Sequence, residues 1–350
     1  MKILLTGVAG FIGAATAKKL LADGNIVVGI DNINDYYDTN LKFNRLKTLG
    51  IGNASQICQK RVQSTLYPDF IFIRLDLNEK AELFQLFAEE NFDVVVNLAA
   101  QPGVRYSLEN PQAYIESNIC GFLNILEGCR HNHVKHLVFA SSSSVYGLNS
   151  KIPFSEKNGT AHPVSLYAAT KKSNEMMAHA YSCVYGLPVT GLRFFTVYGP
   201  WGRPDMSPFL FIDAILNGRP IKVFNNGDMW RDFTYIDDIV ESISRIIHKI
   251  PEPNISWKSD EADPSCSKAP YRIYNIGSQN PIRLMDYIST IEEEIGCEAQ
   301  KEMLPMQPGD VYQTFADSSA LAKIVDFTPS TSLKEGINKT VRWFKDYYSK

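Results

Sequence analysis

The sequence carries almost no excess charge and no hydrophobic run long enough to cross a bilayer. Its 35 lysine and arginine residues against 38 aspartates and glutamates leave a formal net charge of −3. This balance gives no electrostatic reason to expect nucleic acid or an anionic membrane as a partner. Glycines interrupt the apolar N-terminal segment, so it does not have the length of a membrane span. We therefore expect a soluble protein with no nucleic acid and no membrane as partner.

The sequence also lacks paired cysteine motifs. Its six cysteines are widely spaced and contain no Cys-x-x-Cys pair. Such usage, with no secretion signal beside it, indicates a reduced, cytoplasmic chain and not a disulfide scaffold. The histidines at 131–136 have no matching set of cysteines or carboxylates, so we predict no metal site.

What the first half does contain is a regular alternation of short apolar runs with helical patterns. The apolar runs predict buried strands over residues 2–7, 26–31, 70–76, 93–99, 136–141 and 188–194. The helical patterns lie near 11–23, 41–49, 79–91, 111–132 and 165–185. This alternation predicts an α/β fold, a doubly wound parallel sheet of Rossmann type with right-handed crossovers.

The pattern changes after about residue 195, where proline and glycine become frequent and the strands shorten, as in "IKVF" and "RIYNIG". Further helices are expected near 207–218, 235–249, 284–295 and 333–348. We predict a Rossmann domain over 1–195, with later segments near 232–250 packing back onto it. Residues 196–350 are expected to form mostly a smaller C-terminal α/β domain, with an exposed loop over 250–270.

A glycine-rich turn follows the first predicted strand. The segment "LLTGVAGFIG" places Gly7, Gly10 and Gly13 between a strand and a helix. Glycine is needed where a chain turns tightly, where backbone approaches a phosphate and where a helix packs on a strand. The helix that begins near Phe11 would direct its free N–H groups, such as that of Ile12, toward a pyrophosphate.

An aspartate ends the second predicted strand, in "VGID". Asp31 lies 18 residues after Gly13. A carboxylate at this place accepts both ribose hydroxyl protons of an adenosine and repels a 2′-phosphate, which favours NAD over NADP. The alternative is an aspartate that merely starts a polar loop.

Hydroxyl groups follow the strand at 136–141. The segment "SSSSVYG" (141–147) is either a solvated turn or a set of hydroxyls placed to contact a ligand. Downstream, Tyr167 and Lys171 are four residues apart, so on a helix they share one face. The lysine ammonium and an oxidised nicotinamide would both lower the phenol pKa from its usual value of about 10, which makes Tyr167 a candidate base.

Together these motifs resemble the extended short-chain dehydrogenase/reductases of the sugar-nucleotide epimerase and dehydratase group. The resemblance covers nearly the whole chain and is carried by "TGVAGFIG", "NLAAQPGVRYS", "SSSSVYG", "YAATK", "LRFFTVYGP" and "RDFTYIDDI". It implies an NAD-binding first domain and a second domain that binds the nucleotide sugar.

The resemblance also implies roles for individual residues. It places the catalytic hydroxyl at Ser142, the base at Tyr167, and Lys171 on the nicotinamide ribose. The cofactor-binding positions that it implies are Gly7, Gly10, Phe11, Ile12, Gly13, Asp31, Asn32, Asp76, Leu77, Leu98, Ala99, Ala100 and Lys171. The substrate-binding positions that it implies are Ser143, Ser144, Thr196, Arg203, Phe224 and Arg231.

Within this group the sequence is most similar to the UDP-glucuronate 4-epimerases, by the segments at 31–46 and 195–211. Dehydratases carry an Asp-Glu pair where this chain has Ser143 and Ser144, and uronate decarboxylases usually carry Glu at the second position. The resemblance therefore implies epimerisation at C4, with Arg203 on the uronate carboxylate, Arg231 on the diphosphate and Phe224 beside uracil.

Several alternatives stay open. These are a UDP-glucose or UDP-N-acetylhexosamine 4-epimerase, a UDP-glucuronate decarboxylase and a non-catalytic NAD-binding protein. A non-catalytic NAD-binding protein tends to lose Tyr or Lys from the catalytic pair, whereas this chain keeps both.

In this family the helices expected at 111–132 and 165–185 usually pair between subunits, so we predict a homodimer. Precursor supply for polysaccharide biosynthesis is the expected context.

Overall fold

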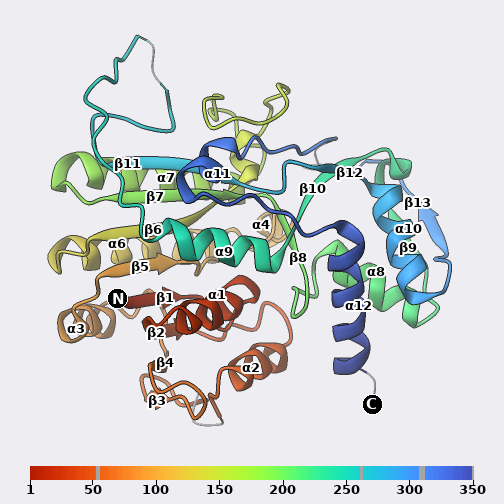
Figure 1. The fold of residues 1–350 in the computed structure, drawn as a ribbon, viewed down its shortest axis with the longest axis horizontal. Helices are drawn as coiled ribbons and strands as arrows, with labels where there is room; N and C mark the ends of the chain where they lie inside the picture. Colours follow the sequence, from red (N-terminus) through yellow and green to blue (C-terminus); the bar gives the residue numbers. More distant parts are fainter. Residues whose placement is uncertain (53–55, 261–262, 307–311, 349–350) are drawn as a thin grey trace. The chain divides into compact units, whose positions relative to one another are not determined.

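An eight-stranded sheet forms the centre of the first part of the chain (Figure 1). The computed structural model describes residues 1–350 except 53–55, 261–262, 307–311 and 349–350. The strand order is β11-β7-β6-β5-β1-β2-β4-β3. The strands are β1 (Lys2–Thr6), β2 (Ile26–Asp31), β3 (Arg61–Gln63), β4 (Phe70–Arg74), β5 (Val94–Asn97), β6 (His136–Ser142), β7 (Val189–Phe194) and β11 (Tyr271–Ile276). The ladders from β4 through β2, β1, β5 and β6 to β7 are parallel, which confirms the predicted fold class.

The strand order reverses beside β1. This strand pairs with β2 on one side and with β5 on the other, so that Thr6 lies opposite both Ile30 and Asn97. The chain therefore leaves the carboxyl ends of β1 and β5 in opposite directions. Open α/β sheets bind ligands at such a switch point.

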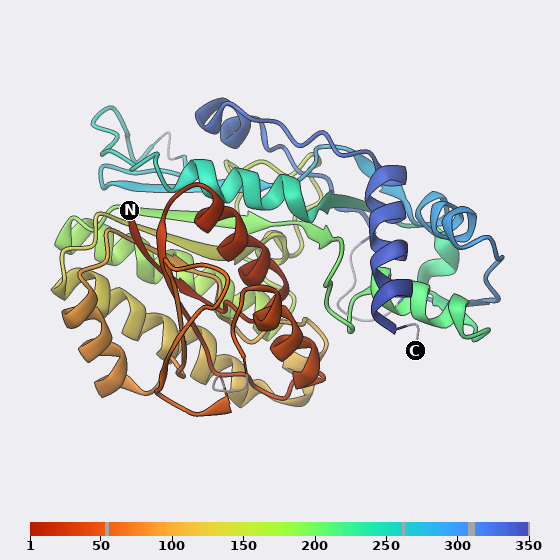
Figure 2. The same cartoon turned by 60° about the horizontal axis from the view of Figure 1, so that its bottom comes forward.

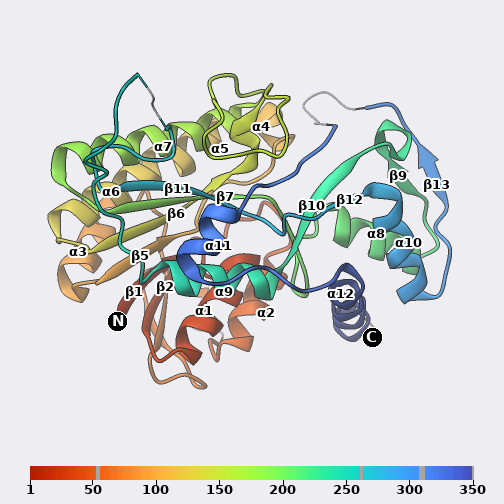
Figure 3. The ribbon, with the colours of Figure 1, turned by 45° about the horizontal axis from the view of Figure 1, so that its top comes forward.

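Helices cover both faces of this sheet, as Figure 3 shows for α3, α6 and α7 on one side and α1 and α9 on the other. The helices of this part are α1 (Phe11–Ala22), α2 (Thr39–Thr48), α3 (Lys80–Glu90), α4 (Tyr106–Glu109), α5 (Pro111–Tyr114), α6 (Gly121–His131) and α7 (Leu166–Tyr185), with most of α9 (Ile236–Ile246). Lys19 on α1 pairs with Glu241 on α9, and the two helices lie side by side in Figure 2. The short 3₁₀ turn η3 (Ser143–Tyr146) follows β6.

The helix predicted over 111–132 contains a wider turn. Residues Ile115–Cys120 form a π-helical segment, η2, between α5 and α6. Its buried residue is Asn118. Such π-bulges occur frequently at functional sites.

Two strands of the large sheet differ from the sequence-based expectation. The segment "RIYNIG" was expected in the smaller domain, but β11 extends the large sheet beside β7, so this assignment was wrong. Strand β3 is a short antiparallel edge strand on β4 whose residues are mostly exposed. Its polar sequence carries no buried face that hydrophobic periodicity could reveal.

The chain divides into two compact units. The first comprises 1–151, 156–194 and 240–275, and the second comprises 152–155, 195–239 and 276–350. The elements of the second unit are β8 (Thr196–Tyr198), α8 (Ser207–Leu216), β9 (Ile221–Val223), η4 (Phe224–Gly227), β10 (Trp230–Tyr235), β12 (Pro281–Arg283), α10 (Leu284–Ile295), β13 (Lys301–Met303), α11 (Ser319–Val325) and α12 (Leu333–Tyr348).

The second unit has its own sheets and its own aromatic core. Strands β12, β10 and β8 form one sheet, and β13 and β9 form another. Phe233 on β10 stacks on Tyr287 of α10 with ring centroids 4.1 Å apart, and Tyr198 on β8 packs edge-on against both. In the described part of the chain, no helix combines the length and the apolar character that a bilayer crossing requires.

Candidate active site

The glycine turn after β1 has a geometry that only glycine allows. Gly7 adopts φ of +72°, and a Cβ there would lie 2.9 Å from the Ala99 nitrogen on the neighbouring strand end. A Cβ on Gly13 would lie 2.0 Å from the Gly7 carbonyl oxygen. Gly10 caps α1 and has no side chain to bind the first N–H groups of the helix. The positive end of a twelve-residue helix therefore faces the turn, as a pyrophosphate site requires.

The Asp31 carboxylate is held in place at the end of β2. One oxygen accepts the Ala9 N–H at 3.0 Å and the other accepts the Ile33 N–H at 2.8 Å. Arg45, which is fully buried on α2, donates to the Ala9 carbonyl at 3.1 Å. The backbone of Ala9 is thus fixed at its N–H by an anion and at its carbonyl by a cation. The sequence reasoning identified the aspartate and missed Arg45.

The other predicted adenosine positions lie at the ends of the neighbouring strands. Asn32 donates from Nδ2 to Asp76 Oδ2 at 2.7 Å, so these two are in contact. Leu77 is buried, and its carbonyl accepts a hydrogen bond from Asn124 on α6 at 2.8 Å. These contacts fix the strand ends around Asp31 in a form that fits an adenosine.

The end of β5 lies beside the end of β1, on the side away from β2. Leu98, Ala99 and Ala100 are half-buried there. The Ala99 N–H donates to Thr6 Oγ1 at 3.0 Å, and that hydroxyl donates to Asn97 Oδ1 at 2.7 Å. This strand end carries no charged side chain and fits the uncharged faces of a nicotinamide or a ribose.

The four serines at 141–144 do not form a solvated turn as a group. Ser141 and Ser142 are buried at the end of the strand, and Ser143 and Ser144 are half-buried in η3. Ser142 Oγ accepts from both the N–H and the hydroxyl of Ser144, at 3.2 and 2.9 Å. The hydroxyls of Ser142 and Ser144 are therefore linked to each other.

Tyr167 and Lys171 lie on the first turns of α7. Lys171 is buried, and its Nζ donates to the Ala140 carbonyl oxygen at 3.0 Å. Burial lowers the pKa of this ammonium to about 8. The ring of Tyr167 contacts Tyr114 edge-on, with centroids 6.1 Å apart. Ala140 lies two residues before Ser142 on β6. The lysine amino group therefore contacts the strand close to the proposed catalytic serine.

Two polar networks around this face involve residues to which the sequence assigned no role. Asn118 of η2 accepts the Gln101 N–H at 2.8 Å and donates to Thr170 on α7 at 3.1 Å. Glu175, one turn beyond Lys171, is fully buried and pairs with Arg193 on β7. The repeated spacing of four residues from Tyr167 through Lys171 to Glu175 is the sequence signal that could have pointed to it.

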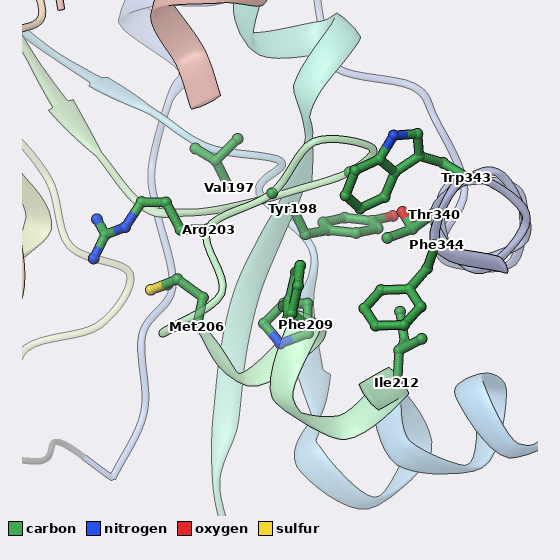
Figure 4. A pocket seen from close by; sticks show the side chains of 12 residues that line it. Val197, Tyr198, Arg203, Met206, Phe209, Ile212, Thr340, Trp343 and Phe344 are labelled. Atoms are coloured by element: carbon green, nitrogen blue, oxygen red, sulfur yellow. The ribbon is translucent and has the colours of Figure 1, made fainter. Parts of the chain in front are cut away.

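The second unit contains the other predicted substrate residues. Thr196 begins β8, and Arg203 lies in the loop that joins β8 to α8. Arg203 forms a bidentate ion pair with Asp205, in which Nε donates to Oδ1 at 3.0 Å and Nη2 donates to Oδ2. Figure 4 shows Arg203 on the rim of a pocket, with its guanidinium directed away from Trp343 and Phe344.

Phe224 and Arg231 occupy separate elements of the second unit. Phe224 is half-buried and begins η4, and Arg231 is half-buried in β10. The Arg231 guanidinium donates to the carbonyls of Trp230 and Tyr312, at 2.8 and 3.1 Å. Across the residues that the structure describes, no three histidines, cysteines or carboxylates gather in a way that would hold a metal ion.

Comparisons with known proteins agree with this architecture. The model of the NAD dependent epimerase/dehydratase family matches residues 3–277. Protein CapI of Staphylococcus aureus is 53% identical to the chain over 100% of both proteins. UDP-glucuronate 4-epimerase 2 of Arabidopsis thaliana is 43% identical over 99% of this chain and 76% of that protein. The crystal structure of UDP-glucuronic acid 4-epimerase from Bacillus cereus, in complex with UDP-glucuronic acid and NAD, superimposes with a TM-score of 0.83 at 32% identity, covering 99% of this chain and 100% of that one.

Proposed function

The chain belongs to the NAD dependent epimerase/dehydratase family, and we propose that it interconverts UDP-glucuronate and UDP-galacturonate. Its relatives include NAD-dependent UDP-sugar 4-epimerases that match it over nearly its whole length. The choice of a uronate as substrate depends on one observation in this chain, the bidentate ion pair between Arg203 and the carboxylate of Asp205.

Arg203 and Asp205 support this choice by their chemistry. A planar guanidinium binds a carboxylate through two parallel N–H bonds, and Arg203 does this to Asp205. We propose that the uronate carboxylate binds the same guanidinium in exchange for Asp205. The neutral hydroxyls of Ser143 and Ser144 would complete the recognition without repelling the anion. A neutral hexose would gain nothing from the arginine.

The first unit would hold NAD by the residues described above. The N-terminal turn of α1 would bind the pyrophosphate, and Asp31 would accept the hydroxyls of the adenosine ribose. When bound, NAD supplies hydride acceptance from the sugar C4 and hydride return to the opposite face, so it is regenerated in every turnover.

The proton at O4 would be handled by the chain itself. Ser142 would hold the O4 hydroxyl, and Tyr167 would remove its proton as hydride leaves C4. The Lys171 ammonium would lower the pKa of Tyr167 and bind the nicotinamide ribose. The resulting 4-keto sugar would turn over in the site, and Tyr167 would give the proton back.

A uronate substrate adds a hazard to this scheme. Once C4 is oxidised, the C5 carboxylate belongs to a β-keto acid, which tends to lose CO₂. The enzyme must hold the bond from C5 to the carboxylate out of alignment with the carbonyl π system and still allow the ring to turn. We propose that Arg203, assisted by Thr196 and the serine hydroxyls, does this.

The test is to incubate the purified protein with UDP-glucuronate, without added NAD, and to follow the sugars by proton NMR. We expect UDP-galacturonate to appear until a plateau is reached. Appearance of a UDP-pentose would instead identify a decarboxylase. Turnover of UDP-glucose or UDP-N-acetylglucosamine alone would keep the 4-epimerase chemistry and overturn the uronate proposal.

Apolar side chains on two helices of the first unit support a homodimer. Leu123 on α6 and Met176 and Val184 on α7 are large, apolar and exposed. The two helices pack against each other on one face of the sheet, so they offer a joint surface to a second copy (Figure 3).

The six cysteine thiols are free, which fits a reducing compartment such as the cytoplasm. We place the activity in the supply of uronates for polysaccharides.

A further inference from the structure

A second charged residue of α7 anchors this helix to the strand that carries the serines. Tyr167, Lys171 and Glu175 follow each other at intervals of four residues on α7, so they share one face. Lys171 binds the Ala140 carbonyl, and Glu175 Oε1 accepts the hydroxyl of the next residue, Ser141, at 2.7 Å. Consecutive residues of β6 are therefore tied to consecutive turns of α7, immediately before Ser142.

Arg193 extends this connection to the neighbouring strand. Its Nε and Nη2 donate to the two oxygens of Glu175 at 2.8 and 2.9 Å, and both side chains are completely buried. Its Nη1 donates to the hydroxyl of Tyr146, the last residue of η3, at 3.1 Å. Tyr146 in turn donates to Asn275 on β11 at 2.6 Å. One buried ion pair thus joins α7, β6, β7 and the turn that carries Ser143 and Ser144.

We propose that Glu175 is a positioning residue, which sets the register of α7 on β6 and thereby the placement of Tyr167 and Lys171 relative to Ser142. The proposal rests on the catalytic roles given to these three residues under the proposed function. Of the two hydrogen bonds described above between α7 and the end of β6, one is made by Lys171, a proposed catalytic residue, and the other by Glu175, which has no role in the chemistry. The Glu175 tie keeps the helix in place while Lys171 interacts with the cofactor.

The expected consequence follows from geometry. Proton and hydride transfer require the reacting groups to be within a few tenths of an ångström of their productive positions, and an error of about 1 Å costs roughly 100-fold in rate. Phe224 and Arg231, the residues proposed to bind the UDP group, lie outside this network. Loss of the Glu175 contacts should therefore lower kcat and leave KM nearly unchanged.

The first test removes one hydroxyl. Ser141→Ala deletes the hydrogen bond to Glu175 and keeps the ion pair with Arg193, so folding is preserved. Ser182→Ala is the matched control, because Ser182 is a buried serine of α7, the helix that carries Glu175, and its hydroxyl has no hydrogen-bond partner among the described residues. We expect kcat to fall roughly tenfold in Ser141→Ala, with KM within twofold, and to stay unchanged in Ser182→Ala.

The second test removes the charge. Glu175→Gln keeps the length of the side chain, and we expect kcat to fall roughly 10- to 100-fold. His136→Gln is its control, because His136 is also buried between β6 and β7 and lies at the opposite end of β6. We expect it to lower the unfolding temperature and to leave kcat unchanged at temperatures where it is folded.

All rates are measured on protein with bound NAD, below the unfolding transition, with whichever UDP-sugar the wild-type protein converts. Failure of the uronate proposal therefore leaves this test intact. Equal kcat in Ser141→Ala and Ser182→Ala would overturn the positioning role. So would a Glu175→Gln variant whose kcat falls only in proportion to its folded fraction, as a purely structural role predicts.

Discussion

Lys171 Nζ donates a hydrogen bond to the Ala140 carbonyl oxygen 3.0 Å away, at a site where the lysine is almost fully shielded from water. Burial lowers the pKa of this ammonium from 10.5 to about 8. The lower pKa corresponds to a cost of about 3 kcal/mol for keeping the charge there at neutral pH. The protein therefore gives up stability at the position where its proposed chemistry needs a cation.

Lys171→Met should separate stability from activity. The variant removes the buried charge and keeps most of the apolar stem, so we expect the free energy of unfolding to rise by about 1–2 kcal/mol. Epimerisation should fall at least about 100-fold, because the tyrosine loses the cation beside it. Urea unfolding of both proteins without NAD measures the first effect. A variant less stable than the wild type would contradict this prediction.

Arg203→Ala should affect uronate substrates selectively. Loss of a charge-assisted, two-pronged contact should raise KM for UDP-glucuronate by roughly 10- to 100-fold. A UDP-pentose should appear among the products, since the carboxylate is no longer held away from the carbonyl plane. Arg219→Ala, which removes a more exposed arginine paired with Asp213 in the same unit, is the control and should keep the wild-type KM. Unchanged KM and products in Arg203→Ala would remove the basis for the carboxylate clamp.

Gly13→Ala should abolish cofactor retention. The added Cβ would lie 2.0 Å from the Gly7 carbonyl oxygen, so the turn must open and the N-terminus of α1 must move. Gly159→Ala is the control, because its added Cβ meets no described atom within 4 Å. NAD released by acid from each purified variant can be measured by chromatography. Equal NAD content in both would show that the turn does not form the cofactor site.

The sequence predicted most of the first unit because its strands are buried on both faces. Apolar runs marked β1, β2, β4, β5, β6 and β7 to within a few residues, and the glycine spacing marked the switch point. Strand order was accessible only through the alternation with helices. The position of β11 could not be predicted, because the six-residue segment Tyr271–Ile276 is compatible with either sheet. Only its pairing with β7 assigns it to the large sheet.

The candidate site shows the same limit at the level of side chains. Ser142, Tyr167 and Lys171 stand out by motif, whereas the spacing of Glu175 from Lys171 and the place of Arg193 in an apolar strand do not show that these two charges pair. Only the packing of α7 on β6 and β7 reveals that both are inaccessible to water. Arg45 was not predicted either, because its partners are a backbone carbonyl and the hydroxyl of Tyr37, and neither is a charged group that sequence could match to it.

Charge on the exposed face of α6 and α7 should prevent association of two copies. The double variant Leu123→Glu/Met176→Glu places two carboxylates on the proposed dimer surface, and we expect a monomer. Met303→Glu, at an exposed position on β13 of the second unit, is the control and should leave the dimer intact. Light scattering coupled to size-exclusion chromatography, at micromolar concentration, measures the mass. A monomeric wild-type protein would overturn the dimer.

His136 should make the fold sensitive to mild acid. It is fully buried, with one ring nitrogen on the Ile247 carbonyl and the other on the Thr190 hydroxyl, and burial lowers its pKa to about 4. Above pH 6.5 the imidazole is neutral in both the folded and the unfolded chain, so it has no effect on pH dependence. As the pH falls from about 6.5 to 4, only the unfolded chain takes up the proton, and the free energy of unfolding should drop by up to about 3 kcal/mol.

His136→Gln isolates this effect from the titration of carboxylates, which both proteins share. We expect the variant to be less stable than the wild type at pH 7, and the gap between the two to narrow as the pH approaches 4.5. Urea unfolding at several values between pH 7 and 4.5 gives the two curves. Parallel curves would mean that His136 is protonated in the folded protein, and that its two hydrogen bonds rearrange to hold the imidazolium.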